Sequence, residues 1–501
     1  MRCGCRRFGE ITSSFPSALK VTSVTFNFYQ NRECKNFVSL EIKPIKMLNT
    51  ATFTPWVLFS DLGIIFGLLL IGKFIRVKVK LVQKLFIPPS LIAGLLGLAL
   101  GPNGLGWLPL SQSVGTYAAV LIAVVFGALP LSSPKFKMKA VAKRVGPMWA
   151  YSQFGMLFQW GVMGLLGILV FKQIWPSLND SFGVMLPTGF YGGHGTAAAI
   201  GSAYEGLGWD EATSLGMTTA TVGVIAAIIG GLVWIKMAAR AKQTKYISDF
   251  QELPDEMRCG LMPMEKRVSA GHATTNPISI DSLTFHFALV VVSAFGGYLL
   301  SQGVKMLWPT LELPVFSCAF VIGLIIKKLM DATKASDYID AKTTSSISSF
   351  ATDLLVACGV ASIKLGVVVK YLVPLIVLLV IGFVLTYYMV FFVGKHLHKD
   401  AWFEKSIFAW GWWSGTMAMG IALLRIVDPK MESKAMDDYA LAYLPCAPVE
   451  ILLITFVPIL FTNGHGLLLS IGCILISLII LLLAKKAGWW IPSSASDNGK
   501  K

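Results

Sequence analysis

Two glycine-rich, uncharged stretches decide the fold of this chain: GFYGGHGTAAAIG at 189–201 and AWGWWSGTMAMGIALL at 409–424. Each carries a Gly-Thr pair, Gly195-Thr196 in the first and Gly415-Thr416 in the second, and each lies between long apolar runs. Glycine has no Cβ, so it permits sharp turns and the close approach of backbone amides to a ligand. Two helix breaks at matching positions in the halves of a membrane chain indicate the binding site of a secondary transporter.

Composition places the chain in a membrane. It is 55% hydrophobic and only 14% charged, with a mean hydropathy of +0.67, whereas about a quarter of the residues of a soluble protein are charged. Uncharged apolar runs long enough to cross a bilayer recur throughout. The net charge of +16 does not indicate nucleic-acid binding, because the basic residues cluster in short loops between the apolar runs. We therefore expect an all-α polytopic membrane protein.

No catalytic, nucleotide-binding or paired metal-ligand motif is present in the sequence. HExxH, GxSxG and Walker motifs are all absent, so we expect neither an enzyme nor an ATP-driven pump, and no cofactor. Four of the eight cysteines, Cys318, Cys358, Cys446 and Cys473, lie in apolar segments and fit small buried hydrophobes. His396 and His398 are two residues apart and do not share a helix face.

The chain divides into five parts. Residues 1–46 hold eight Lys and Arg, three Cys and no sustained apolar run, so we expect a disordered extension or a start-site artefact rather than a signal peptide. The remaining parts are an N-terminal repeat at 47–235, a cytoplasmic linker at 236–281, a C-terminal repeat at 282–461, and an extra span with a tail at 462–501.

The charge rule orients the predicted spans. With the start of the first span outside, 28 Lys and Arg fall in inside loops and seven outside. The segment 183–204 is then a re-entrant hairpin from the outside. If 406–424 re-enters from the inside, 31 Lys and Arg fall inside and four outside. The two halves, with five spans and one hairpin each, are then inverted in the membrane, and the span 466–484 has no counterpart.

Weak internal matches support the repeat. FIPPSLIAGLLGL at 86–98 is similar to LPVFSCAFVIGLI at 313–325. The Gly-Thr pairs lie 220 residues apart, and Pro88 and Pro314 lie 226 apart. Agreement between these offsets indicates a duplication more strongly than any single match.

The first stretch also resembles a known family. GFYGGHGTAAAIG is similar to the hallmark of the sodium/glutamate symporter family, and LLVACGVASIKLGVV at 354–368 resembles a second family segment. The resemblance covers nearly the whole chain from Met47. It implies two inverted five-helix domains with paired re-entrant loops, a homodimer, an elevator-like motion and sodium-coupled carriage of glutamate or related acids. Trp410, Trp412 and Trp413 before the second loop, and the extra C-terminal span, depart from the family pattern.

The candidate site residues in the first hairpin are Gly192, Gly193, His194, Gly195 and Thr196. Close helix packing could also explain the glycines, but their repetition in the second half favours a hairpin. His194 could be functional, as isolated intramembrane histidines often are, or could hold the loop through a backbone carbonyl, which we favour slightly.

Ser414, Gly415 and Thr416 are the matching candidates in the second hairpin. Hydroxyl oxygens suit Na⁺, so Thr196, Ser414 and Thr416 are candidates for a sodium site, while free amides at helix N-termini suit a carboxylate. Arg425 could bind a carboxylate in two-point fashion or could pair with Asp428 at the interface.

Two carboxylates lie within predicted spans, Asp353 in 344–363 and Glu450 in 439–461. Intramembrane acids are costly and usually line an ion or substrate path. Asp353 could instead reach the interface, because serines precede it. Glu450 is deeper and follows Pro445 and Pro448, so it is the more informative of the two.

The sequence thus predicts a sodium-coupled symporter that imports L-glutamate or a related small carboxylate across the plasma (inner) membrane. The alternatives are a sodium- or proton-coupled di- or tricarboxylate carrier and a channel. A channel is disfavoured because its spans should carry a continuous polar stripe. The expected partners are an acidic small molecule, sodium, the lipid bilayer and a second copy of the chain.

Overall fold

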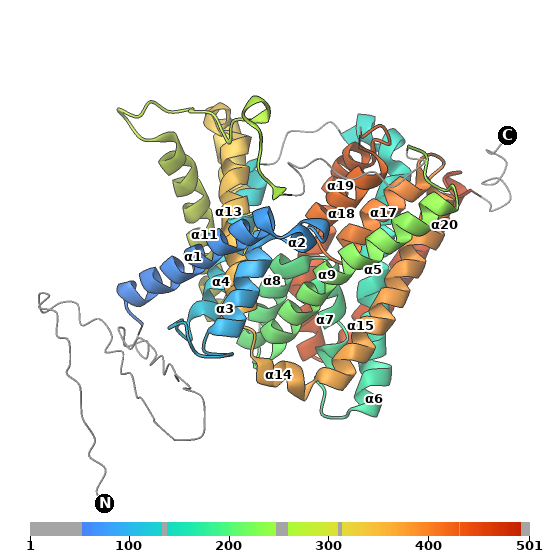
Figure 1. Cartoon of the computed structure of the whole chain (residues 1–501), viewed down its shortest axis with the longest axis horizontal. Helices are drawn as coiled ribbons and strands as arrows, with labels where there is room; N and C mark the ends of the chain where they lie inside the picture. The colour runs from blue at the N-terminus through green and yellow to red at the C-terminus, as the bar shows by residue number, and fades with distance from the viewer. Residues whose placement is uncertain (1–52, 133–137, 247–258, 309–312, 430, 492–501) are drawn as a thin grey trace, which may run out of the picture.

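The computed structural model describes residues 53–132, 138–246, 259–308, 313–429 and 431–491. Within these ranges the regular structure is entirely helical, and nine helices are long and apolar enough to cross a membrane. Figure 1 shows them as a bundle of long helices, with the short helices α6 (Lys172–Ile174) and α14 (Leu365–Lys370) at its lower edge in this view. The expected all-α polytopic fold is confirmed. The segment 1–46 lies outside the described residues.

The first half begins with a span that starts at Pro55, directly after Thr54, whose hydroxyl accepts a hydrogen bond from the Val57 amide. Proline at the first helical position loses no backbone hydrogen bond. The principal helices of this half are α1 (Pro55–Lys78), α2 (Lys80–Lys84), α3 (Pro89–Leu100), α4 (Val114–Ser132), α5 (Met138–Leu166), α6 (Lys172–Ile174), α7 (Met185–Phe190), α8 (Gly193–Gly206) and α9 (Ala212–Arg240).

The second half repeats this order of long, short and paired helices. Its members are α11 (Ser282–Leu307), α12 (Val315–Ala332), α13 (Ala341–Ala361), α14 (Leu365–Lys370), α15 (Leu372–Tyr387), α16 (Gly394–Leu397), α17 (Trp402–Trp413), α18 (Met417–Val427) and α19 (Ala435–Thr462). The last helix, α20 (Gly466–Lys486), follows as the expected extra span. The inverted repeat and the domain boundaries remain predictions.

The helices pack in two groups. One group has α4 packed against α13 at its centre and consists of α1, α3, α4, α11, α12 and α13. Glycines permit the close crossings here: a methyl group on Gly97 of α3 would lie 2.8 Å from the Cβ of Ala361, and one on Gly127 of α4 would lie 3.1 Å from the Cβ of Ser293. The other group contains α5, α7 to α9 and α15 to α20 (Figure 1).

The extra helix α20 lies along α5. The indole of Trp489 packs on Gly146, and Ile474 and Ser470 pack on Gly161. The contacts move from Gly146 to Gly161 along α5 as they move back from Trp489 to Ser470, so the two helices are antiparallel. Beyond α20, the Ile491 amide donates to the carbonyl of His396 at 2.8 Å, which joins the segment after α20 to the end of α16.

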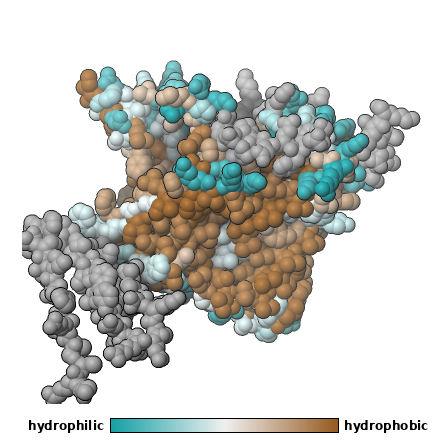
Figure 2. Space-filling model, in the orientation of Figure 1, coloured by the Kyte–Doolittle hydropathy of each residue, from teal (hydrophilic) through white to brown (hydrophobic). Residues whose placement is uncertain are grey.

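The molecular surface fits a bilayer. Figure 2 shows hydrophobic residues over the broad middle of the molecule and hydrophilic residues gathered above it in the view. Among the exposed large hydrophobics are Phe74, Phe295 and Leu482, each about 60% exposed. Apolar surface of this extent is favourable only against lipid or protein.

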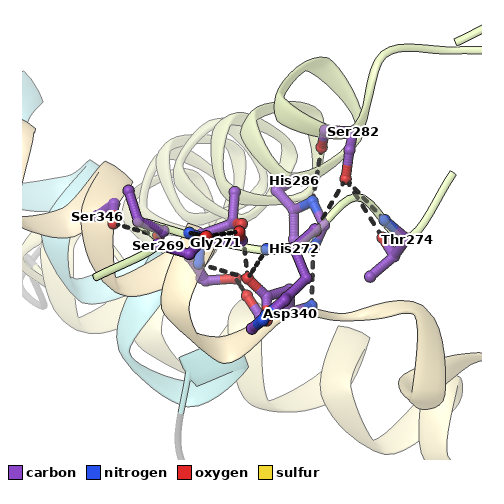
Figure 3. Close-up of polar contacts among 11 residues, drawn as sticks. Ser269, Gly271, His272, Thr274, Ser282, His286, Asp340 and Ser346 are labelled. Carbon is purple, nitrogen blue, oxygen red and sulfur yellow. Dashed lines mark hydrogen bonds and ion pairs between the residues drawn. The ribbon is translucent and has the colours of Figure 1, made fainter. Parts of the chain in front are cut away.

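The described end of the linker folds against the helix group around α13. Asp340, the N-cap of α13, accepts hydrogen bonds from the amides of Thr343 at 2.9 Å and His272 at 3.0 Å, and from the Thr343 hydroxyl at 2.7 Å (Figure 3). The hydroxyl of Ser346 adds a bond to the carbonyl of Ala270. We call this set, Ala270, His272, Asp340, Thr343 and Ser346, the linker clasp.

His286 completes the attachment from α11, and its tautomer follows from its partners. Its Nδ1 lies 2.6 Å from the carbonyl of Ser282, which can only accept, and its Nε2 lies 2.7 Å from the amide of Asp340, which can only donate (Figure 3). The imidazole is therefore neutral, with its proton on Nδ1. It ties the start of α13 to the first turn of α11.

Candidate functional site: two opposed helical hairpins

The first glycine-rich stretch forms a hairpin of α7 and α8 on one half of α9. Along α7, Met185 accepts from the Thr219 hydroxyl at 2.8 Å, and Phe190 lies 3.1 Å from a methyl group built on Gly223. The chain then reverses direction along α8. A methyl group on Gly201, late in α8, would lie 2.6 Å from the Cα of Thr213, at the start of α9. The turn between the two arms is thus nearest the middle of α9.

The second stretch forms a hairpin of α17 and α18 on the other half of α9. The Trp410 indole donates to the carbonyl of Ala227 at 2.9 Å, and the Ser414 carbonyl reaches Gly223. The arm α18 then runs back until Leu423 packs on Gly231. This hairpin therefore approaches the middle of α9 from the end opposite to that used by the first.

The two tips meet. Gly193 has a φ of +62°, in the region that L side chains rarely adopt. A Cβ at this position would lie 3.1 Å from the carbonyl oxygen of Gly415 and 3.2 Å from the Cγ2 of Thr416. Residues 222 positions apart in the sequence are thus in contact at the centre of the bundle. The structure brings together the two Gly-Thr stretches that the sequence singled out.

Helix N-termini lie at this meeting point. The helix α8 begins at Gly193, after its N-cap Gly192, and α18 begins after its N-cap Thr416. The first amides of a helix lack intrahelical partners, and they carry the positive end of the helix dipole. Two such ends near each other favour an anion such as a carboxylate.

The candidate sodium ligands lie on the segments that form this meeting point. Thr196 is buried one turn into α8, with its hydroxyl beside Gly192. Ser414 is fully buried, and its hydroxyl donates to the carbonyl of Trp410 at 2.6 Å, which leaves its lone pairs as acceptors. Thr416 accepts weakly from the Met419 amide at 3.4 Å. These hard oxygen atoms have the chemistry that sodium prefers.

His194 attaches the first hairpin to α9. Its Nε2 lies 3.1 Å from the Thr221 hydroxyl, and its side chain is buried. A methyl group on its neighbour Gly195 would lie 3.6 Å from Ile122 of α4, an ordinary contact. The position of His194 agrees with a structural role for this histidine, although the bond is to a side chain rather than to a backbone carbonyl.

A chain of aromatic rings runs from the tips to Glu450. Tyr191, in the turn of the first hairpin, lies 4.8 Å from Trp412 between ring centroids, and Trp412 lies 4.3 Å from Tyr439 of α19. One turn further along α19, the Tyr443 hydroxyl donates to Oε2 of Glu450 at 2.5 Å. Glu450 is thus half-buried beside the hairpins, and its place on a transport path stays a prediction.

The structure separates two other candidates from the tips. Arg425 lies in the last turn of α18, at the far end of that arm from Thr416. The carboxylate of Asp428, its suggested partner, accepts from the backbone amides of Glu432 and Ser433. Asp353 lies in the middle of α13, in the other helix group, and its side chain is exposed.

The exposure of Asp353 has a pattern. Ser345, Ser349 and Asp353, spaced four residues apart, are all exposed and share one face of α13. An acid on such a face in a membrane helix is expected to border water or another polar group. Asp353 therefore lies on a polar face of α13, and not among the residues at the tips.

Sequence reasoning missed two features. The first is the role of α9, whose residues Thr219, Thr221 and Gly223 receive both hairpins. The run of small residues in GMTTATVG at 216–223 did not reveal it, because such runs occur in any closely packed membrane helix. The second is Asp61 of α1, which is buried and accepts from the Ser111 amide at 2.8 Å and from the Tyr117 hydroxyl at 2.7 Å. Asp61 fixes α1 to the start of α4.

Comparison with known proteins agrees with this architecture. The model of the family described as sodium/glutamate symporter matches residues 58–418. The chain belongs to this family. It is thus a multi-pass membrane transporter that couples sodium to glutamate.

Among solved structures, the chain is similar to the sodium proton antiporter MjNhaP1 from Methanocaldococcus jannaschii at pH 8, with 16% identity and a TM-score of 0.36, over 83% of this chain and 99% of that one. No curated protein matches the sequence.

Proposed function

We propose that the meeting point of the two hairpins is the substrate and sodium site, and that the protein imports L-glutamate across the plasma membrane. The observation that supports this most directly is the contact of Gly193 with Gly415 and Thr416. It places two helix N-termini and several hydroxyl oxygens at one point, which suits a carboxylate and sodium together.

The roles within the site follow from chemistry. The first amides of α8 and α18 bind a carboxylate of the substrate. Oxygens of Thr196, Ser414 and Thr416 bind sodium. Glu450 lies beside the tips and provides a negative charge for the substrate amino group or for a coupling cation. Asp353, on the polar face of α13, attracts cations toward the site. Arg425, at the end of α18, does not contact bound substrate in this arrangement.

Uptake into proteoliposomes tests this function. The purified protein is reconstituted, and uptake of labelled L-glutamate is measured with an inward sodium gradient and with potassium in place of sodium. We expect accumulation only with sodium. Protein-free liposomes are the control. Sodium-independent equilibration would indicate a channel.

Competition identifies the substrate class. Unlabelled L-glutamate should abolish uptake of the label, whereas a di- or tricarboxylate without an amino group should not. Stronger inhibition by such an acid than by glutamate would favour the alternative carboxylate carrier. Chemical cross-linking of the reconstituted protein tests the homodimer that we expect from the family, since it should trap two copies.

A further inference from the structure

A large cavity lies apart from the hairpin tips. Its volume is about 650 Å³, and its walls come from both helix groups: α4, α11 and α12 on one side, and α8 and α19 on the other. Its lining includes Ala123, Ala203, Val291, Ala294 and Phe316. The residues of the tips, Gly193, Gly415 and Thr416, do not line it.

The lining changes along the length of the cavity. Val291 and Ala294, near the middle of α11, are apolar, whereas Gln302 and Lys305 in the last two turns of the same helix are polar. Lys305 follows Val291 by 14 positions, which corresponds to about 21 Å of helix. One leaflet of a bilayer has a hydrocarbon depth of about 15 Å, half of the hydrocarbon core. The cavity thus extends from an apolar interior to a cationic end over roughly one leaflet.

The cavity is also accessible from the side. Val120, Phe295 and Tyr298 line it and are 65%, 59% and 49% exposed on the bundle surface. In a membrane this surface faces lipid. Cavities of this size commonly hold one largely apolar ligand oriented by a few polar groups. Glutamate is a poor fit, because the lining is mostly apolar and contains one cation but no carboxylate for the substrate amino group.

We infer that this cavity binds a phospholipid, with one acyl chain between α4, α8 and α11 and the phosphate beside Lys305 and Gln302. Lys305 is exposed at the polar end of the lining, and the long stem of a lysine can cover apolar surface while its ammonium reaches the interface, where lipid phosphates lie. The bound chain contacts both helix groups at once. Binding at this site is independent of the function proposed for the hairpin tips.

Photolabelling tests the site in the full-length protein. It is reconstituted with a phospholipid that carries a diazirine in the middle of one acyl chain, irradiated and mapped by peptide mass spectrometry. We expect labels on Ala203 of α8 and Ala123 of α4, which line the cavity, in addition to the outward faces of α11. Labels confined to outward faces would overturn the inference.

Two variants with matched controls sharpen the test. Ala294→Trp fills the cavity and should reduce the labelling of α8 to background. Ala288→Trp, on an exposed part of the same helix outside the lining, should leave it unchanged. Equal labelling of α8 in both variants would contradict the proposal. Monodispersity in detergent confirms that each variant is folded.

The head-group end is tested at the surface, where misfolding is not expected. Lys305→Gln removes a charge-assisted hydrogen bond and should weaken retention of the co-purified phospholipid about tenfold. Lys364→Gln, an exposed lysine outside the lining, is the control. Unchanged retention in Lys305→Gln, or displacement of the label by free fatty acid in preference to phospholipid, would reject a phospholipid as the ligand.

Discussion

The contact at Gly193 carries the argument for the site at the scale of single residues. Its positive φ costs an L side chain about 1–2 kcal/mol, and a Cβ would also crowd the carbonyl of Gly415. Gly193→Ala should therefore reduce sodium-dependent uptake strongly by separating the tips. Gly303→Ala, on α11 away from the tips, is the control, because a methyl group there meets nothing within 4 Å. Uptake by both variants is compared at equal protein. Equal rates would show that the contact of the tips is not needed for transport.

The valine substitutions distinguish a hairpin from ordinary helix packing. Gly193→Val and Gly415→Val add a β-branched side chain at the tips, which forbids the positive φ of Gly193 and keeps a ligand away from the backbone. We expect both variants to lose transport while they stay monodisperse in detergent. Aggregation of both before any measurable loss of uptake would point to packed helices instead.

Asp340 gives a prediction for the linker clasp. Partial burial raises the pKa of this carboxyl, but the hydrogen bonds from Thr343 and His272 outweigh it and hold the pKa well below its usual range. A carboxyl whose pKa is lower in the folded protein stabilises the fold at pH values above the pKa of the unfolded chain, about 3.9. This stabilisation is lost as the pH falls through the folded pKa. The clasp should therefore be fully formed at neutral pH.

Asp340→Asn tests this at pH 7, because it removes the charge and one acceptor oxygen. The described part of the linker, 259–281, should then be cut faster by a protease added to the reconstituted protein. Asp337→Asn, an exposed neighbour, should not change the rate. If the two variants were cut equally fast, the clasp would not hold the linker.

At the scale of elements, the two hairpins approach α9 from opposite ends, so their bases should open to opposite sides of the membrane. Glu205 at the end of α8 and Glu432 after α18 are both exposed. In a background without native cysteines, Glu205→Cys should react with an impermeant thiol reagent from outside, and Glu432→Cys only from inside. Reaction of both from the same side would rule out the inverted arrangement.

The helix breaks could be predicted from the sequence, but the contacts between helices could not. The glycines of both stretches predicted the helix breaks, because a break is a local property of the backbone. The meeting of Gly193 with Gly415 could not be read from sequence, since contacts across more than 200 residues depend on the packing of α9. The small residues of α9 were indistinguishable from those of any packed membrane helix. Asp61 was missed because its partners, Ser111 and Tyr117, lie 50 and 56 residues away.

The positions of Asp353 and Glu450 in the fold could not be predicted from the sequence either. Asp353 and Glu450 both lie inside apolar runs, which the sequence shows, but only the packing of α13 and α19 separates them. Asp353 is exposed on the polar face of α13, and Glu450 receives the Tyr443 hydroxyl beside the hairpins. Sequence therefore located two acids within membrane helices, but it could not show whether they lie at one place in the fold or at two.

At the scale of the whole molecule, α20 supports the hairpins through α5. The ring of Trp413, in the last turn of α17, packs directly on Gly155 of α5, and α20 covers the same helix through Gly146 and Gly161. A substitution that disturbs the packing of α20 should therefore also displace α5 and lower the stability of the whole bundle, although α20 contributes no residue to the tips.

Gly161 provides the test. A methyl group at Gly161 would lie 2.8 Å from the carbonyl of Ser470 and from Ile474, so α20 must move away, whereas one at Gly472 of α20 meets nothing within 4 Å. Alanine is favoured over glycine in a helix by up to about 1 kcal/mol. Gly472→Ala should therefore keep or raise the melting temperature in detergent, while Gly161→Ala should lower it despite the same gain in helix propensity. A higher melting temperature for Gly161→Ala would mean that α20 is free to separate from α5 without cost.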